Sequence, residues 1–183
     1  NAKLDAEGVI GDPTEVALMR WALDNGVDAA QIIRQFPRVA EIPFDSRRKR
    51  MSTVHQTGLE KIVYVKGALE SVLPLCTHLW QDGRRVELTT PMRRQIEEAA
   101  AQMAGEALRV LVLATRTVAS LDESQFETRL CFIGMAGMID PPKEGVKEAI
   151  ALAHKAGIDV VMITGALHRA ASSHASSGRS LWL

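Results

Sequence analysis

Three short segments rich in β-branched residues follow one another closely in the first half of the chain, and they constrain the fold more than any other feature. They cover residues 39–44, 51–55 and 61–66, and only a charged turn and a Thr57-Gly58 turn separate them. Links this short suit neighbouring strands that run in opposite directions. The sequence therefore predicts an antiparallel meander.

Helix signals surround these strands. Asp12 is expected to cap a helix that begins at Pro13, with Glu15 closing a capping box and Gly26 ending the helix. A second short helix is expected after Asp28. Further helices are predicted over residues 68–75 and 90–105, and an Asp82-Gly83 hairpin turn lies between them.

Two more apolar segments, residues 108–117 and 130–139, complete the predicted sheet. The expected fold class is α/β of the α+β type, an antiparallel β-sheet flanked by helices. Beyond it, a helix over 144–156 and a buried strand over 159–163 are typical of part of an α/β unit. The polar tail, residues 166–183, has no periodicity and is expected to be a linker or disordered.

Composition excludes some classes of protein. The chain has 22 lysines and arginines against 22 aspartates and glutamates, and 4% of its residues are aromatic, which disfavours nucleic-acid binding by bulk charge or base stacking. No apolar run approaches the roughly 20 residues that span a bilayer. Cys76 and Cys131 are expected to be reduced core thiols.

Four stretches carry residues suited to binding chemistry. Phe44, followed by a run of cations, could stack on a nucleotide base while the cations hold its phosphates. Lys66 ends a strand beside Gly67, which lets a ligand approach the backbone closely. Glu15 and Arg109 complete the set. Each has a structural alternative: helix capping for Glu15, core packing for Phe44, and solvent exposure for the two cations.

The order of the motifs is more specific than any one of them. Taken together, the chain resembles a P-type cation-transporting ATPase of the calcium-pump-like branch over residues 6–165. The motifs that carry the resemblance are Gly11-Asp12-Pro13-Thr14-Glu15, Phe44-Asp45-Ser46-Arg47-Arg48-Lys49-Arg50, Lys66-Gly67-Ala68, Leu108-Arg109-Val110-Leu111, Asp140-Pro141-Pro142-Lys143 and Thr164-Gly165.

The resemblance implies that residues 1–139 are most of a nucleotide-binding domain, lacking its N-terminal part. It also implies that 140–165 are a hinge and part of a phosphorylation domain. The implied nucleotide-binding residues are Glu15 near the adenine, Phe44 stacked on it, Lys49, Lys66 and Gly67 in the pocket, and Arg109 at the phosphates. Asp140, Pro141 and Pro142 would form the hinge, and Thr164 and Gly165 would begin a phosphorylation-domain motif.

The sequence also departs from the family pattern. The Asp-Lys-Thr-Gly-Thr stretch that holds the aspartyl nucleophile is absent, and Ala166 stands where the family has an aspartate. We therefore expect the chain to bind ATP without hydrolysing it. In the parent protein the implied cofactors are ATP and Mg2+, and the implied partners are the phosphorylation and membrane domains of the same chain. The implied location is a cytoplasmic domain of an integral membrane protein that transports a cation, with Ca2+ favoured.

Two alternatives remain at this point. The strand over 159–163 would also suit a hydrolase of the haloacid-dehalogenase type, although no early segment supplies its aspartate nucleophile. The run Arg47 to Arg50 would suit a nucleic-acid-binding module, whose affinity should fall steeply with salt. Neutral net charge weighs against the second alternative.

Overall fold

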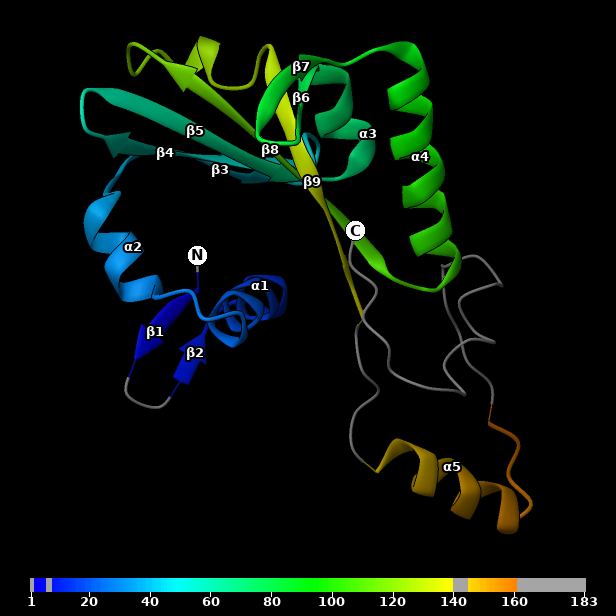
Figure 1. The fold of residues 1–183 in the computed structure, drawn as a ribbon. Helices are drawn as coiled ribbons and strands as arrows, with labels where there is room; N and C mark the ends of the chain where they lie inside the picture. Colours follow the sequence, from blue (N-terminus) through cyan, green and yellow to red (C-terminus); the bar gives the residue numbers. More distant parts are fainter. Residues whose placement is uncertain (1, 6–7, 140–144, 161–183) are drawn as a thin grey trace.

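A seven-stranded β-sheet forms the centre of the molecule in the computed structural model, which describes residues 2–5, 8–139 and 145–160 (Figure 1). The strand order is β3-β4-β5-β8-β9-β6-β7. The strands are β3 (Arg38–Asp45), β4 (Arg50–Thr57), β5 (Glu60–Gly67), β6 (Cys76–Gln81), β7 (Arg84–Glu87), β8 (Arg109–Val118) and β9 (Leu130–Met138). A separate two-stranded sheet pairs β1 (Lys3–Asp5) with β2 (Gly8–Ile10).

The predicted meander is confirmed, because β3, β4 and β5 pair antiparallel in sequence order. The expectation of a purely antiparallel sheet is wrong: β6 pairs parallel with β9, so the sheet is mixed. The physical reason is the long connection from β6 to β9, which passes through β7, a helix and β8. A connection of that length lets two strands run in the same direction, whereas a tight turn does not.

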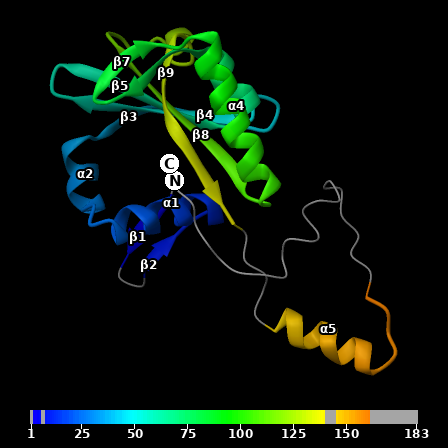
Figure 2. The ribbon, with the colours of Figure 1, turned by 45° about the vertical axis from the view of Figure 1, so that its right-hand side comes forward.

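Helices cover both faces of the sheet (Figures 1 and 2). On one side lie α1 (Pro13–Asp24) and α2 (Ala29–Gln35), and on the other lie α3 (Leu69–Val72) and α4 (Thr90–Gly105). Short 3-10 turns, η1 (Leu73–Leu75) and η2 (Glu123–Gln125), complete this part. The helix α5 (Val146–Lys155) lies apart from the sheet in both views.

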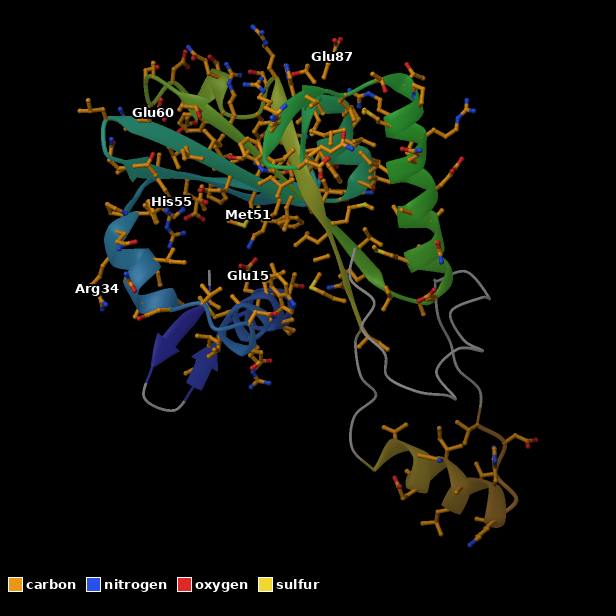
Figure 3. The ribbon with its side chains drawn as sticks, in the orientation of Figure 1. Glu15, Arg34, Met51, His55, Glu60 and Glu87 are labelled. Carbon is orange, nitrogen blue, oxygen red and sulfur yellow. The ribbon has the colours of Figure 1, made fainter. Side chains whose placement is uncertain are left out.

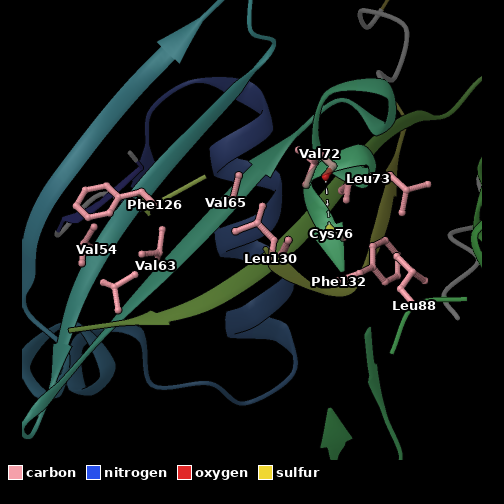
Figure 4. Close-up of a cluster of buried hydrophobic side chains, with 13 residues drawn as sticks. Val54, Val63, Val65, Val72, Leu73, Cys76, Leu88, Phe126, Leu130 and Phe132 are labelled. Carbon is pink, nitrogen blue, oxygen red and sulfur yellow. Dashed lines mark hydrogen bonds between the residues drawn. The ribbon is translucent and has the colours of Figure 1, made fainter. Parts of the chain in front are cut away.

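The main hydrophobic core lies between the sheet and the helices α3 and α4 (Figure 4). Val54, Val63, Val65 and Val112 are at most 1% exposed. They alternate along their strands with residues that face the other side, as the pleat of a strand requires. Both cysteines are buried free thiols, as predicted. The opposite face of the sheet, which α1 and α2 cover, is not part of this core and can carry a site (Figures 1 and 2).

Several predictions concern the end of the chain. The helix expected over 144–156 is present as α5, but residues 158–160 are neither helix nor strand. The rest of the expected strand, residues 161–163, lies outside the described residues, as does the tail. The same holds for five candidate residues: Asp140, Pro141, Pro142, Thr164 and Gly165.

Candidate functional site

A cavity of about 840 Å3 lies between the sheet and the pair of helices α1 and α2. Figure 3 shows Met51 and His55 extending from the sheet toward the side where Glu15 and Arg34 lie. Residues that line the cavity include Met19 of α1, Ala30, Ile33 and Arg34 of α2, and Met51, Thr53, His55, Tyr64, Lys66 and Leu113 of the sheet. The lining combines apolar and aromatic groups with a few cations.

The strand register explains which side chains reach this cavity. Met51 on β4 lies opposite Lys66 on β5, which in turn lies opposite Leu113 on β8. Residues directly opposite one another in a sheet point to the same face. The three side chains therefore form one row across the centre of the sheet, on the face turned away from the main core.

Glu15 and Lys66 are in direct contact at this face. Both carboxylate oxygens of Glu15 accept hydrogen bonds from Lys66 Nζ. The two side chains are 15% and 21% exposed, so the ion pair is largely shielded from water. Although burial opposes its ionisation, the hydrogen bonds from Lys66 keep the pKa of Glu15 below its usual value.

This contact gives Glu15 a second role beside the one expected at the helix start. Asp12 does cap α1, because its Oδ1 accepts a hydrogen bond of 3.0 Å from the Thr14 amide. The Glu15 carboxylate accepts hydrogen bonds from Lys66 across the cavity, which the spacing of the helix start does not predict. The reciprocal bond of the capping box, from the Asp12 amide to Glu15, stays a prediction.

Phe44 lies where the register of β3 with β4 shifts, between Ile42 and Asp45. A register shift re-aims the side chains beside it, so alternation alone does not set the side to which Phe44 points. Its side chain is 63% exposed, which excludes a role as a core residue. A flat, exposed ring beside cations is a suitable surface for a nucleotide base.

Arg109 begins β8 and shares the face of Leu113, because four residues along one strand return to the same side. The two positions are about 13 Å apart along the strand at about 3.3 Å per residue. Arg109 is exposed. Neither Phe44 nor Arg109 is among the described residues that line the cavity. The structure thus brings Glu15 and Lys66 into contact and puts Arg109 on the same face.

Lys49 and Gly67 lie where the turn between β3 and β4 meets the end of β5. Lys49 Nζ is 2.8 Å from Glu70 Oε1, and both side chains are more than half exposed. A Cβ at Gly67 would lie 2.5 Å from the carbonyl oxygen of Lys49 and equally close to Arg50 Cβ. Gly67 therefore lets two backbone segments touch. The close approach of a ligand at Gly67 stays a prediction.

A second ion-pair network holds the same turn, and no sequence pattern predicts it. Glu127 accepts hydrogen bonds of 2.7 Å from Arg48, Arg50 and Ser52. Although burial opposes ionisation, these donors lower the pKa of the Glu127 carboxyl. Of the four cations from Arg47 to Arg50, three are thus held in ion pairs, which leaves little free charge for a nucleic acid.

Two further residues of the cavity, His55 and Tyr64, were missed at the level of sequence. Their rings meet edge to face, with centroids 5.6 Å apart, and His55 Nδ1 is 2.8 Å from the Phe36 carbonyl oxygen. The signal was available, because the alternation that turns Met51 toward the cavity also turns Thr53 and His55 there.

Residues 2–5, 8–139 and 145–160 also bear on metal binding and on membrane insertion. In these ranges no three or more histidine, cysteine, aspartate or glutamate side chains are grouped so that they could hold a metal ion. Within the same ranges, no helix combines the length and the apolar character needed to cross a membrane.

Comparisons with known proteins agree with one another. A family model described as the cytoplasmic domain N of P-type ATPases matches residues 1–145. The chain is 42% identical over 167 residues to a calcium-transporting ATPase 1 of Bacillus cereus, covering 90% of this chain and 19% of that protein. It is 42% identical over 166 residues to the cation-transporting ATPase pma1 of Synechocystis, covering 88% and 18%.

A mammalian relative shows the same pattern. The calcium-transporting ATPase type 2C member 1 of Bos taurus is 37% identical over 161 residues, covering 86% of this chain and 16% of that protein. The chain therefore spans less than a fifth of the length of the curated relatives that it matches.

Proposed function

Since the chain belongs to the P-type cation-transporting ATPases, of which it contains the cytoplasmic domain N, we propose that it binds ATP. One observation carries the proposal: Lys66 and Arg109 share a face of the sheet, Lys66 lines a cavity of about 840 Å3 there, and the exposed Phe44 ring lies on β3 of the same sheet. Adenine would stack on the Phe44 ring, and the triphosphate would extend toward the cations.

The charges on this face fit such a ligand. Lys66 supplies an ammonium group at the cavity, and Arg109 supplies a guanidinium group on the same face. Arginine forms paired hydrogen bonds with phosphate oxygens, whereas lysine acts as a point charge. Glu15, held against Lys66, would lie near the adenine and accept a hydrogen bond from its amino group.

The proposed role is to position ATP for phosphoryl transfer to an aspartate outside this chain. Phosphoryl transfer depends mainly on positioning and on stabilisation of charge, so one domain can bind the nucleotide while another carries the nucleophile. Mg2+ would accompany the triphosphate and neutralise part of its charge. In the parent protein this step would drive the transport of a cation, for which Ca2+ is the first candidate.

We further propose that residues 140–165 lead into a phosphorylation domain, with Asp140, Pro141 and Pro142 as the hinge. Supporting this, α5 exposes apolar side chains that a larger domain would cover: Val146 is 40% exposed and Leu152 is 69% exposed. Thr164 and Gly165 would belong to that domain. The parent would be a membrane protein with this part in the cytoplasm.

Titration of the chain with ATP, followed by NMR, tests the proposal. The amide signals of Phe44, Lys66 and Arg109 should shift together, with one dissociation constant. Adenosine should shift Phe44 but leave Arg109 unchanged, because it lacks phosphates. If millimolar ATP produces no shifts, or shifts only residues of the α4 face, the chain does not bind ATP in the proposed way.

A further inference from the structure

The carboxylate of Glu127 joins the loop before β9 to the turn that follows Phe44. Arg48 donates from Nη1 to both Glu127 oxygens, Arg50 donates from Nε, and Ser52 donates from its hydroxyl, each over 2.7 Å. The Glu127 side chain is only 12% exposed. Hydrogen bonds between charged groups at such lengths are the strong ones, and shielding from water strengthens them further.

The same arginine also holds the backbone next to Phe44. Arg48 Nη2 donates a hydrogen bond of 3.0 Å to the carbonyl oxygen of Pro43. This carbonyl lies in the part of β3 where the register with β4 shifts, between Ile42 and Asp45. A register shift re-aims the side chains beside it. The direction of the Phe44 ring therefore depends on how this irregular backbone is held.

Among the described residues, packing contributes little to fixing the direction of the Phe44 ring. Its side chain is 63% exposed, so packing around it is sparse. On the other side of the turn, Asp45 Oδ1 accepts hydrogen bonds from the amides of Arg47 and Arg48, which sets the shape of the turn. The Glu127–Arg48–Pro43 chain of contacts supplies the complementary restraint from the body of the domain.

We propose that Glu127 is a positioning residue for adenine binding, acting through Arg48 and Pro43 on the ring of Phe44. This inference rests on the proposed function. A binding surface held in its productive geometry before the ligand arrives loses less entropy when the ligand binds. Glu127 touches no nucleotide in this scheme. Its carboxylate orients Arg48, and Arg48 restrains the peptide that carries the stacking ring.

The loop that carries Glu127 has other anchors, so its fold does not depend on this carboxylate alone. The Phe126 side chain is fully buried in the core. Arg116 donates to the carbonyl oxygens of Gln125 and Thr128. A Glu127→Gln variant should therefore keep the loop in place while it weakens the hold on Arg48.

The experiment measures the affinity for ATP and for adenosine by calorimetry in four variants of the chain. Glu127→Gln should weaken the binding of both ligands by about tenfold. This loss should be smaller than that caused by removing the ring, because the ring is misdirected and not removed. Asp122→Asn is the matched control, since it also changes a carboxylate of this loop to an amide. In the described contacts Asp122 caps η2 and forms hydrogen bonds only within the loop. The affinity of the Asp122→Asn variant should therefore equal that of the wild type.

A double variant separates positioning from general loss of structure. In the Phe44→Ala background, Glu127→Gln should cause no further loss of affinity, because there is no ring left to position. Equal losses in both backgrounds would overturn the proposal, as would wild-type affinity in a folded Glu127→Gln variant. If Glu127→Gln fails to fold, Arg48→Lys decides, because lysine cannot span Glu127 and Pro43 at once. A wild type that binds no ATP overturns the proposed function itself, which is a distinct result.

Discussion

The Lys66 ammonium on β5 donates to both carboxylate oxygens of Glu15 on α1, 51 positions earlier in the chain. The contact fastens the first helix to the face of the sheet that carries the candidate site. The Glu15–Lys66 pair thus holds α1 against the sheet and also sets the charge at the cavity. Its effects can be measured on both stability and binding.

The first consequence is acid sensitivity. Despite burial, the hydrogen bonds from Lys66 lower the pKa of Glu15, so its contribution to stability is full above the unfolded value of 4.5. That contribution is lost as the pH falls through the lower folded value. Glu15→Gln should cost about 1 kcal/mol at pH 7, and the difference from the wild type should shrink below pH 4. Urea unfolding at several pH values measures it, and a pH-independent difference would contradict the assignment.

Phe44 should matter for binding and not for folding. Phe44→Ala should weaken adenine binding by about 1–3 kcal/mol, the usual value of stacking a base on an aromatic ring. The melting temperature should change little, since the side chain is 63% exposed. Trp80→Ala on β6 is the control, because it removes another half-exposed aromatic ring and should leave affinity unchanged. Titration calorimetry with adenosine gives the affinities of the Phe44→Ala and Trp80→Ala variants.

Lys66 should discriminate by phosphate charge. Lys66→Met should weaken ATP more than adenosine, and the loss for ATP should be larger at low salt, where screening is weaker. Lys61→Met provides a control on the same strand, since Lys61 contacts the Ala119 carbonyl instead of the cavity. Equal losses for ATP and adenosine would mean that Lys66 acts only by holding α1.

Gly67 should be intolerant of a side chain. In Gly67→Ala the new Cβ would lie 2.5 Å from backbone and side-chain atoms of the adjacent turn, so the turn must move. We expect a loss of about 1–3 kcal/mol in the free energy of unfolding. Gly134→Ala on β9 is the matched control, since nothing lies within 4 Å of its added Cβ. Denaturant unfolding of the two variants makes the comparison, and equal stabilities would refute the close contact.

The cysteines should be chemically inert in the folded chain. Desolvation by burial raises the pKa of Cys76 to about 12 and also raises that of Cys131. Because the thiolate is the reactive form, a thiol reagent at pH 8 should label neither residue until the chain unfolds. Mass spectrometry before and after denaturation counts the labels, and rapid labelling of the native chain would exclude the buried arrangement.

Local patterns predicted the elements well, because helix caps and alternation act over a few residues. The cap at Asp12 and the three strands of the meander are examples. The contacts that build the site act over much longer separations. Glu127 lies 77 and 79 positions from its two arginines, and no spacing rule links them.

The same limit explains what the sequence did not predict. Glu15 has the right spacing for a capping box, but that spacing does not show that the fold brings Lys66 to its carboxylate. The parallel pairing of β6 with β9 depends on how a long connection crosses the sheet, which neither strand encodes. Alternation does put Arg109 on the face of Lys66, but only once the pairing of β5 with β8 is known.

The far end of β8 and β9 has a mechanical consequence. Arg109 lies opposite Met138, and β5 pairs with β8 only from Val112 onward, so in the described register residues 109–111 and 136–138 form a ribbon of two strands. Two-stranded ribbons are on average more strongly twisted than wide sheets. A turning force applied at residue 139 would act first on this ribbon, in which Arg109 lies opposite Met138.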